Sequence, residues 1–374
     1  MLDADVAARV DLGRRIADGR ALASLTQAEL ADRAAIERTA LAKIESGSRK
    51  LSATELVRLA DALDRSADWF FSPSPAAVVS RRADPAVGGR SPALDSRVER
   101  IARDVSALVD AGDIAADLGP SVSFETPSSL EEAEESARHA RVALGADGGP
   151  LLELQAAAER VGMLAFSLDL GRSGGDAAYV SLSERLGVAV VNGAMEPGRR
   201  RFNLAHELGH HLFGDAYAPE VGLSPQDETE RMVNAFAIHL LLPRDAVLDV
   251  WGDMGSSPRL AAIALAVRFR VSWTAVCAQL RNLRLIDPGQ QEELAARPPG
   301  RADFVELGEQ WVPELAAPSV PPQFGRRILS GYRRGKLSRA RTLELLWGTV
   351  ADDELPAQDE IPLEAYRREF EPLT

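Results

Sequence analysis

Apolar side chains recur at helical spacing over the first part of the chain. The repeating positions are Leu12, Ile16, Leu22, Leu25, Leu30, Ala34, Leu41, Ile44, Leu56, Leu59, Ala60 and Leu63. Two capping boxes fit this pattern, because Thr26 is followed by Glu29 and Ser52 is followed by Glu55. We therefore expect a compact set of short helices over residues 8–70.

The pattern changes after this region. Residues 72–92 are dominated by Pro, Gly and Ser, which predicts a linker. Beyond the linker, helices are expected at 94–118, 128–144, 151–161, 200–213, 226–242, 257–285 and 324–347, and strands at 163–168, 177–182 and 187–192. The Pro- and Gly-rich stretch 290–325 is expected to be irregular.

These elements predict an α+β multidomain protein with an all-α N-terminal domain and a helical C-terminal region. The expected parts are an N-terminal domain at 1–72, a linker at 73–95, an α+β domain with N-terminal helices at 96–250, a helical module at 251–290 and a helical or irregular region at 291–374.

Charge is unevenly distributed along the chain. The net charge is -13, but residues 1–65 hold 11 basic and 11 acidic side chains and are neutral. Residues 38–50 carry four basic side chains and one acidic one, which makes a small basic patch on an acidic protein. Cys277 is the single cysteine, and the sequence shows neither a signal peptide nor a membrane span. We expect a soluble cytoplasmic protein without membrane contacts.

The basic patch coincides with a pattern typical of a helix-turn-helix. Helices at 27–33 and 38–46 are separated by a turn near 34–36, and the second helix would enter the major groove of DNA. The expected DNA-binding residues are Gln27, Arg38, Thr39 and Lys43 near the bases, and Arg49 and Lys50 at phosphates. The expected partner is double-stranded operator DNA, and a homodimer would suit paired half-sites. A helical docking module with the same core is the alternative.

The run RRRFNLAHELGHHLFGD contains a metal-binding pattern. His206 and His210 are four residues apart, so on a helix both imidazoles can reach one ion at about 2.0–2.1 Å. Glu207 is offset around the helix, where it can remove a proton from metal-bound water. The expected cofactor is one zinc ion (Zn2+) per chain. A surface helix with two solvated histidines is the alternative.

A catalytic zinc site needs a third protein ligand. A histidine six residues after the second is excluded, because that position is Ala216. The run DETERMVNAFAIHLLLP offers Glu230 and Glu228. Glu230 is favoured because it shares a helix face with Asn234, which can orient one of the imidazoles from behind.

The other histidines and two tyrosines are secondary candidates. We expect His211 to face away from the site on the surface, His239 to be a satisfied helix residue and His139 to be solvated. Tyr179 and Tyr217 are candidates for stabilising an oxyanion, because a tyrosine hydroxyl can donate to one.

Two segments allow two interpretations each. The strand around 188–191 is either an edge strand that pairs with a substrate backbone or an ordinary core strand. The segment 259–287 forms helix, turn at Arg270-Val271-Ser272 and helix, with Ser272 as an N-cap. This second pattern is either another DNA contact or a packing module, and the packing module is favoured.

These motifs make two parts of the sequence resemble two known families. Residues 8–70 resemble Xre/Cro-type helix-turn-helix regulators through Leu25-Thr26-Gln27-Ala28-Glu29-Leu30-Ala31 and Lys43-Ile44-Glu45-Ser46-Gly47. Residues of about 128–290 resemble the ImmA/IrrE zinc metallopeptidases through the runs RFNLAHELGH, ERMVNAFA and LLP. The second resemblance implies a minimal zincin-like α+β metallopeptidase domain and carries the third ligand over to Glu230. Val233 stands where that family often has Ala.

The resemblance implies a regulatory peptidase that cleaves a partner repressor in a stress or mobile-element response. The expected function is a DNA-binding transcriptional regulator with a zinc endopeptidase domain. One alternative is a non-proteolytic repressor or antitoxin whose metallopeptidase-like domain binds or senses a partner. Another is a purely structural zinc domain, which the intact Glu207 disfavours because a structural site needs no general base.

Overall fold

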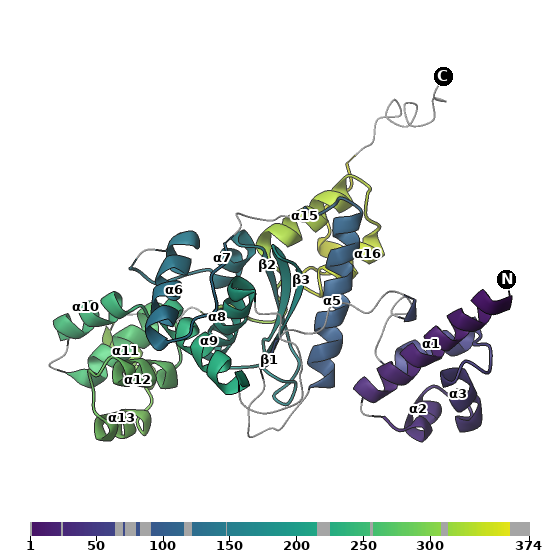
Figure 1. The fold of residues 1–374 in the computed structure, drawn as a ribbon. Coiled ribbons are helices and arrows are strands. Elements are labelled where there is room, and N and C mark those ends of the chain that lie inside the picture. The colour runs from purple at the N-terminus through teal and green to yellow at the C-terminus, as the bar shows by residue number, and fades with distance from the viewer. Residues whose placement is uncertain are drawn as a thin grey trace.

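The protein is described from a computed structural model. The described residues are 2–23, 25–63, 70–71, 80–82, 91–115, 122–146, 148–214, 225–254, 257–307 and 313–359. Helices dominate, and a single small sheet lies in the middle of the described chain (Figure 1). The architecture is α+β, which confirms the predicted fold class.

The N-terminal region is entirely helical. Its helices are α1 (Leu2–Leu22), α2 (Gln27–Arg33), α3 (Arg38–Glu45) and α4 (Ala53–Ala62). They share a core of their own, built from Ile16, Leu30, Leu41, Ile44 and Leu59, each at most 2% exposed. Both predicted capping boxes are present, at Thr26 for α2 and at Ser52 for α4. The first helix begins at Leu2, earlier than the apolar spacing predicted.

The sheet has the strand order β1-β3-β4-β2. Its strands are β1 (Ser80–Arg82), β2 (Met163–Leu168), β3 (Ala177–Ser183) and β4 (Leu186–Asn192). β2 and β4 are parallel, whereas β3 is antiparallel to both β4 and β1. The three later strands agree with the predicted ones to within a residue. β1 was not predicted, and it comes from the range expected to be linker.

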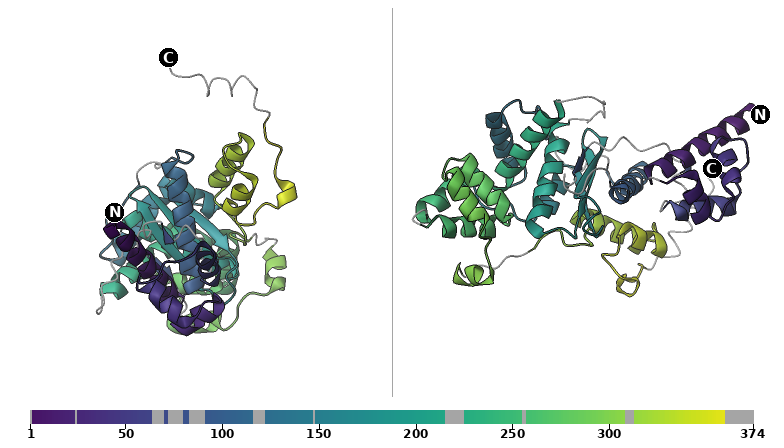
Figure 2. Two further views of the ribbon diagram at one scale, coloured as in Figure 1. Left: turned by 90° about the vertical axis from the view of Figure 1, so that its right-hand side faces the viewer. Right: turned by 90° about the horizontal axis from the view of Figure 1, so that it is seen from below.

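Helices cover both faces of the sheet (Figures 1 and 2). Successive strand residues point to opposite faces, and every residue of β2 and β4 is buried because both faces are covered. On one face, α7 (Leu154–Arg160) and α8 (Pro197–Phe213) pack against the strands, α9 (Pro225–Leu241) packs on α8, and α6 (Leu130–Ala143) packs on α9. The other face packs on α5 (Pro92–Asp110), α15 (Pro322–Arg333) and α16 (Arg339–Leu345).

A further helical group extends the first of these layers. It comprises α10 (Arg244–Met254), α11 (Pro258–Phe269), α12 (Trp273–Asn282), α13 (Pro288–Ala295) and α14 (Arg301–Leu307). The last two helices correct the prediction that residues 290–325 are irregular. No single helix in the described part of the chain is long and apolar enough to cross a membrane; α11 and α12 reach that length only together, across a bend of 117°.

The C-terminal helices are held to the sheet layer by a buried carboxylate. Glu159 of α7 is 2% exposed and accepts hydrogen bonds from the backbone N–H groups of Gln323 and Phe324, at 2.8 and 2.6 Å. These are the first N–H groups of α15, which lack partners within the helix. Burial raises the pKa of Glu159 despite the two hydrogen bonds. The contact therefore fixes the start of α15 against α7.

Candidate metal centre

Helix α8 carries the HExxH sequence through the interior of the domain. It starts with Pro197 at its first turn, where a proline's missing N–H costs nothing, and it ends at Gly214 in the left-handed conformation, with φ of 60°. Nearly every residue between them is buried. The helix therefore packs on all sides, and its polar side chains occupy defined positions in the interior.

A buried arginine fixes the first half of α8. Arg201 is 1% exposed, donates to the carbonyl oxygen of Leu151 at 2.6 Å and pairs with Glu314. Glu314 also pairs with Arg270 at 2.5 Å, so one carboxylate joins α8 to the end of α11. The sequence alone did not single out Arg201, because its partners are far away in the chain and it lies in a run of three arginines.

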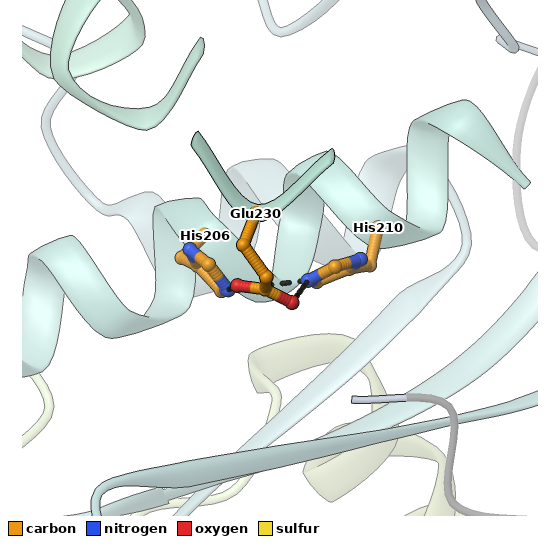
Figure 3. A group of neighbouring side chains, drawn as sticks. All are labelled: His206, His210 and Glu230. Atoms are coloured by element: carbon orange, nitrogen blue, oxygen red, sulfur yellow. Dashed lines mark hydrogen bonds and ion pairs between the residues drawn. The ribbon is translucent and has the colours of Figure 1, made fainter. Parts of the chain in front are cut away.

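The two histidines of the motif point to the same side of α8 (Figure 3). Their Nε2 atoms are 3.1 Å apart, and each residue is 2% exposed. The one-turn separation of His206 and His210 brings the rings together, as the spacing predicted.

Glu230 reaches between the two imidazoles from α9. Its carboxylate oxygens lie 3.3 Å from Nε2 of His206 and 3.5 Å from Nε2 of His210 (Figure 3). Among the described residues, the ligand atoms of His206, His210 and Glu230 lie close enough together to share one metal ion. These three residues are called the His/Glu group below. Glu228, the alternative ligand, is exposed and lies outside the group.

Close packing of α8 on α9 makes this meeting possible. A Cβ atom added to Gly209 would lie 2.9 Å from Cγ1 of Val233 and 3.1 Å from Cδ1 of Phe236. Such contacts are too short for an ordinary side chain, so only glycine lets α9 approach to this distance. Gly209 therefore permits the close packing of α8 on α9.

The electrostatics of the group favour an ionised carboxylate. Burial opposes ionisation of Glu230, but the hydrogen bonds and charges of His206 and His210 outweigh it, so the pKa of Glu230 is held well below its ordinary value. The Nδ2 of Asn234 donates to the backbone carbonyl of Glu230 at 2.7 Å. Asn234 thus braces the turn of α9 that bears the carboxylate, and its predicted contact with a histidine stays a prediction.

Glu207 lies within the same helix and is fully buried. It follows His206 directly, which places it about 100° around the helix axis from that imidazole. The structure therefore puts a second carboxylate beside the His/Glu group without making it a member of the group.

His211 corrects one prediction. It is buried, at 7% exposed, and is not a surface residue. Its Nε2 donates to the carbonyl oxygen of Val161 at 2.9 Å, so Nδ1 accepts from the hydroxyl of Tyr179 at 2.8 Å. Burial lowers the pKa of His211. The hydroxyl of Tyr179 is thereby engaged away from the His/Glu group, and Tyr217 lies outside the described residues.

The two other histidines behave as predicted. His239 is buried and its Nδ1 lies 3.2 Å from Nε2 of Gln279, so it is a satisfied helix residue. His139 is exposed, with its Nε2 3.2 Å from Glu135.

The strand at 188–191 is the core strand of the two interpretations left open by the sequence. β4 lies between β3 and β2, so it is an inner strand and cannot pair with a substrate backbone. On the side of β3 away from β4, the sheet instead ends with β1. Sheet order depends on long-range pairing, which the spacing of apolar residues does not report.

The predicted DNA contacts lie on α2, α3 and the turn after α3. Five of the six are exposed: Arg38, Thr39, Lys43, Arg49 and Lys50. Gln27 is half-buried and its Nε2 donates to Glu45 at 2.7 Å. Arg49 pairs with Glu55 at 2.8 Å. Two of the predicted contacts are therefore already engaged by acidic neighbours of the same region.

The second helix-turn-helix-like pattern is packed into the domain. The side chain of Ser272 accepts from the backbone of Ala275, which confirms the predicted N-cap of α12. Most of α11 is buried in the same core as α8 and α9. This burial accords with the packing interpretation of the segment.

Fold and site together define a helix-turn-helix protein that also carries a peptidase-like α+β domain. Residues 16–70 match the helix-turn-helix family model, and residues 158–281 match the Peptidase M78 model, described as the IrrE N-terminal-like domain. The second match spans β2 to α12 and includes the whole His/Glu group. Both matches confirm the resemblances that the sequence motifs indicated.

The chain is similar to the restriction-modification controller protein C.AhdI from Aeromonas hydrophila, with 31% sequence identity and a TM-score of 0.17. That match covers 17% of this chain and 98% of the controller protein. The search of curated proteins found no match.

Proposed function

We propose that this protein is a DNA-binding transcriptional regulator whose peptidase-like domain is a zinc-dependent endopeptidase that cleaves a partner regulatory protein. The spacing of the donor atoms of His206, His210 and Glu230 supports the zinc assignment. Zinc bonds of about 2.0–2.2 Å in a tetrahedral site put neighbouring donor atoms about 3.3–3.6 Å apart. The two Nε2 atoms are 3.1 Å apart, Oε2 of Glu230 lies 3.3 Å from Nε2 of His206, and Oε1 of Glu230 lies 3.5 Å from Nε2 of His210.

Two nitrogen donors and one oxygen donor suit a catalytic zinc site. Such a site takes three protein ligands and keeps one position open. In this proposal His206, His210 and Glu230 hold the ion, and Asn234 positions Glu230. A zinc ion bound there would supply a Lewis acid and a water molecule of lowered pKa.

Glu207 is the general base in this mechanism. It takes a proton from the attacking water and gives it to the nitrogen of the departing amine. Its burial within α8 holds the carboxylate in one place beside the ligand group. A purely structural metal site would have no use for this carboxylate.

The N-terminal helices supply the DNA contacts in the same proposal. Arg38, Thr39 and Lys43 lie on the exposed face of α3 and read base edges, with Gln27 at the start of α2. Arg49 and Lys50 bind phosphates. The DNA that these residues bind is an operator, and a homodimer would occupy its paired half-sites.

The decisive experiment combines metal analysis with cleavage of candidate partners. The zinc-loaded wild-type protein and Glu207→Gln are incubated with the products of neighbouring genes. We expect wild type to cut one of them and Glu207→Gln to cut about 10²–10⁴-fold more slowly while keeping its zinc. If the zinc-loaded wild type cuts none of the candidates, the proposal that it cleaves a partner regulator is wrong, and if Glu207→Gln cuts equally fast, Glu207 is not the general base.

A further inference from the structure

A strand from the segment before the peptidase-like domain lies along one edge of the sheet. β1 pairs antiparallel with β3, with Ser80 opposite Tyr179 and Arg82 opposite Ala177. The other side of β3 is taken by β4. The pairing occurs although the surrounding sequence is rich in Pro, Gly and Ser, so the outer edge of β3 accepts an extended backbone.

β3 is fixed alongside the part of α8 that carries the HExxH sequence. Arg199, in the first turn of the helix, donates to Asp176 at 2.6 Å, directly before β3. Near the other end of the helix, His211 bonds to Tyr179 within β3. Arg199 and His211 are twelve residues apart, which is about 18 Å of helix. β3 therefore runs past the HExxH turns in the same direction as α8.

The functional side chains project toward this side of the helix. His210 comes eleven residues after Arg199, which is about three turns at 3.6 residues per turn, so both leave α8 in nearly the same direction. Glu207 lies about one turn before His211. Because Arg199 and His211 hold β3, His210 and Glu207 face the side where β3 lies. β1 lies on the outer edge of β3 and itself packs near α8.

We propose that the chain is a substrate of its own peptidase-like domain and is cut at β1. This inference rests on the zinc peptidase function proposed above. An edge strand recognises an extended peptide through its backbone, largely independently of side chains. β1 presents such a backbone beside the candidate metal centre, and its covalent connection to the domain gives it a high effective concentration there.

The reaction is a hydrolysis that needs no reactant besides water. The water oxygen bonds to a carbonyl carbon of β1, and the bond from that carbon to the next nitrogen breaks. Glu207 takes one proton from the water and passes it to the departing nitrogen. The products are a new carboxylate and a new amine, and nothing is oxidised or reduced. The cut separates α1–α4 from the peptidase-like domain, and so uncouples DNA binding from the peptidase.

The first test follows the intact mass of the full-length protein after zinc is added. We expect wild type to yield two fragments whose new ends lie within or next to Ser80–Arg82, at a rate independent of protein concentration. Glu207→Gln should stay intact over the same time. A rate proportional to protein concentration would overturn cleavage in the same chain, and fragments that end elsewhere would overturn β1 as the site.

The second test measures occupancy of the edge without relying on activity. In zinc-loaded Glu207→Gln, we expect the amides of Ala177–Tyr179 that point away from β4 to exchange slowly with deuterium. Replacing all three β1 residues by proline removes the backbone donors of β1 and should speed this exchange at least about tenfold. Replacing the same three residues by alanine keeps the donors and should leave exchange slow. Equal exchange in the proline and alanine variants would overturn the proposal.

The failure of this inference is distinguishable from failure of the proposed function. A zinc-loaded protein that cuts a partner regulator but leaves its own linker whole keeps the peptidase function and overturns self-cleavage. A zinc-loaded protein that cuts neither overturns both.

Discussion

The candidate metal centre and the predicted DNA-binding surface are built in opposite ways. His206, His210 and Glu207 are at most 2% exposed and sit in a helix packed on all sides. The predicted DNA contacts on α3, among them Arg38 and Lys43, are exposed. Packing fixes the first set, whereas exposed side chains of the second set can take a different geometry against a ligand.

This difference predicts how each region responds to substitution. A site whose donors converge on one point loses its function when one donor is removed. A surface of separate exposed contacts loses affinity in steps, roughly additively for distant positions. We expect the two regions to respond to substitution in these two ways and independently of each other.

The largest effect is expected at His206, in comparison with His211 five residues further along α8. His206→Ala should lower the zinc content from about one ion per chain to near zero, because two donors remain for an ion that needs three. His211→Ala should keep the zinc, since the structure places that imidazole between Tyr179 and Val161. Metal analysis of the purified variants after dialysis measures both.

His211→Ala should keep its zinc but lose some stability, and measuring this loss provides the control. It leaves the buried hydroxyl of Tyr179 and the carbonyl of Val161 without this partner, which should lower the free energy of unfolding by about 1–3 kcal/mol. Denaturation by urea measures that loss. If His211→Ala loses zinc as completely as His206→Ala, the assignment of roles along α8 is wrong.

The second effect concerns the exposed surface. Arg38→Ala should weaken operator binding by about 1–3 kcal/mol, a factor of roughly 5 to 150, without changing the zinc content. Arg58→Ala is the matched control, because Arg58 is an exposed arginine on α4 outside the predicted contact set. Fluorescence anisotropy with labelled DNA at several salt concentrations measures both variants. Equal losses in the two would mean that general positive charge, and not α3, carries the affinity.

The grouping of His206, His210 and Glu230 in the candidate metal centre was largely predictable from the sequence because its signals are local. The HExxH spacing fixes two donors within one turn of α8, and the choice of Glu230 over Glu228 follows from the helical face shared with Asn234. The strands β2, β3 and β4 were predicted to within a residue, because buried strands give short continuous apolar runs.

What the sequence did not predict depends on partners that are distant in the chain. The burial of His211 depends on Tyr179 and Val161, and the inner position of β4 depends on which strands pair. The helix α13 was missed for a different reason. Most of it lies in the Pro- and Gly-rich stretch that was expected to be irregular, although Asp287 caps the helix and Pro288 is favoured in its first turn.

The third effect tests the packing that brings the two ligand-bearing helices together. Gly209→Ala forces a methyl group against Val233 and Phe236 of α9 and should lower the free energy of unfolding by about 1–3 kcal/mol. Gly252→Ala is the control, because a Cβ at Gly252 of α10 meets no atom within 4 Å. That variant should be neutral or more stable by up to about 1 kcal/mol, since alanine favours helix. Urea denaturation that ranks the two variants in the other order would contradict close packing at Gly209.

The smallest effect is expected at the cap of α4, which follows the exposed turn bearing Arg49 and Lys50. Ser52→Ala removes the side-chain acceptor for the N–H of Glu55 and should lower the stability of the N-terminal helices by about 1 kcal/mol at neutral pH. The zinc content should not change, because the N-terminal helices have a core of their own. Thermal unfolding followed by circular dichroism measures the loss. A change in metal content would show that the two regions are coupled.

The same cap predicts a dependence on pH. The hydrogen bond from the backbone N–H of Ser52, with further bonds from its hydroxyl and from Arg49, lowers the pKa of Glu55 below its ordinary value of 4.5. The carboxylate therefore adds stability above pH 4.5, and that contribution is lost as the pH falls through the lowered pKa. Glu55→Gln, which cannot ionise, should be less stable than wild type at neutral pH and should approach wild type in acid. If the difference between the two instead grows as the pH falls, the ionised carboxylate does not stabilise the cap.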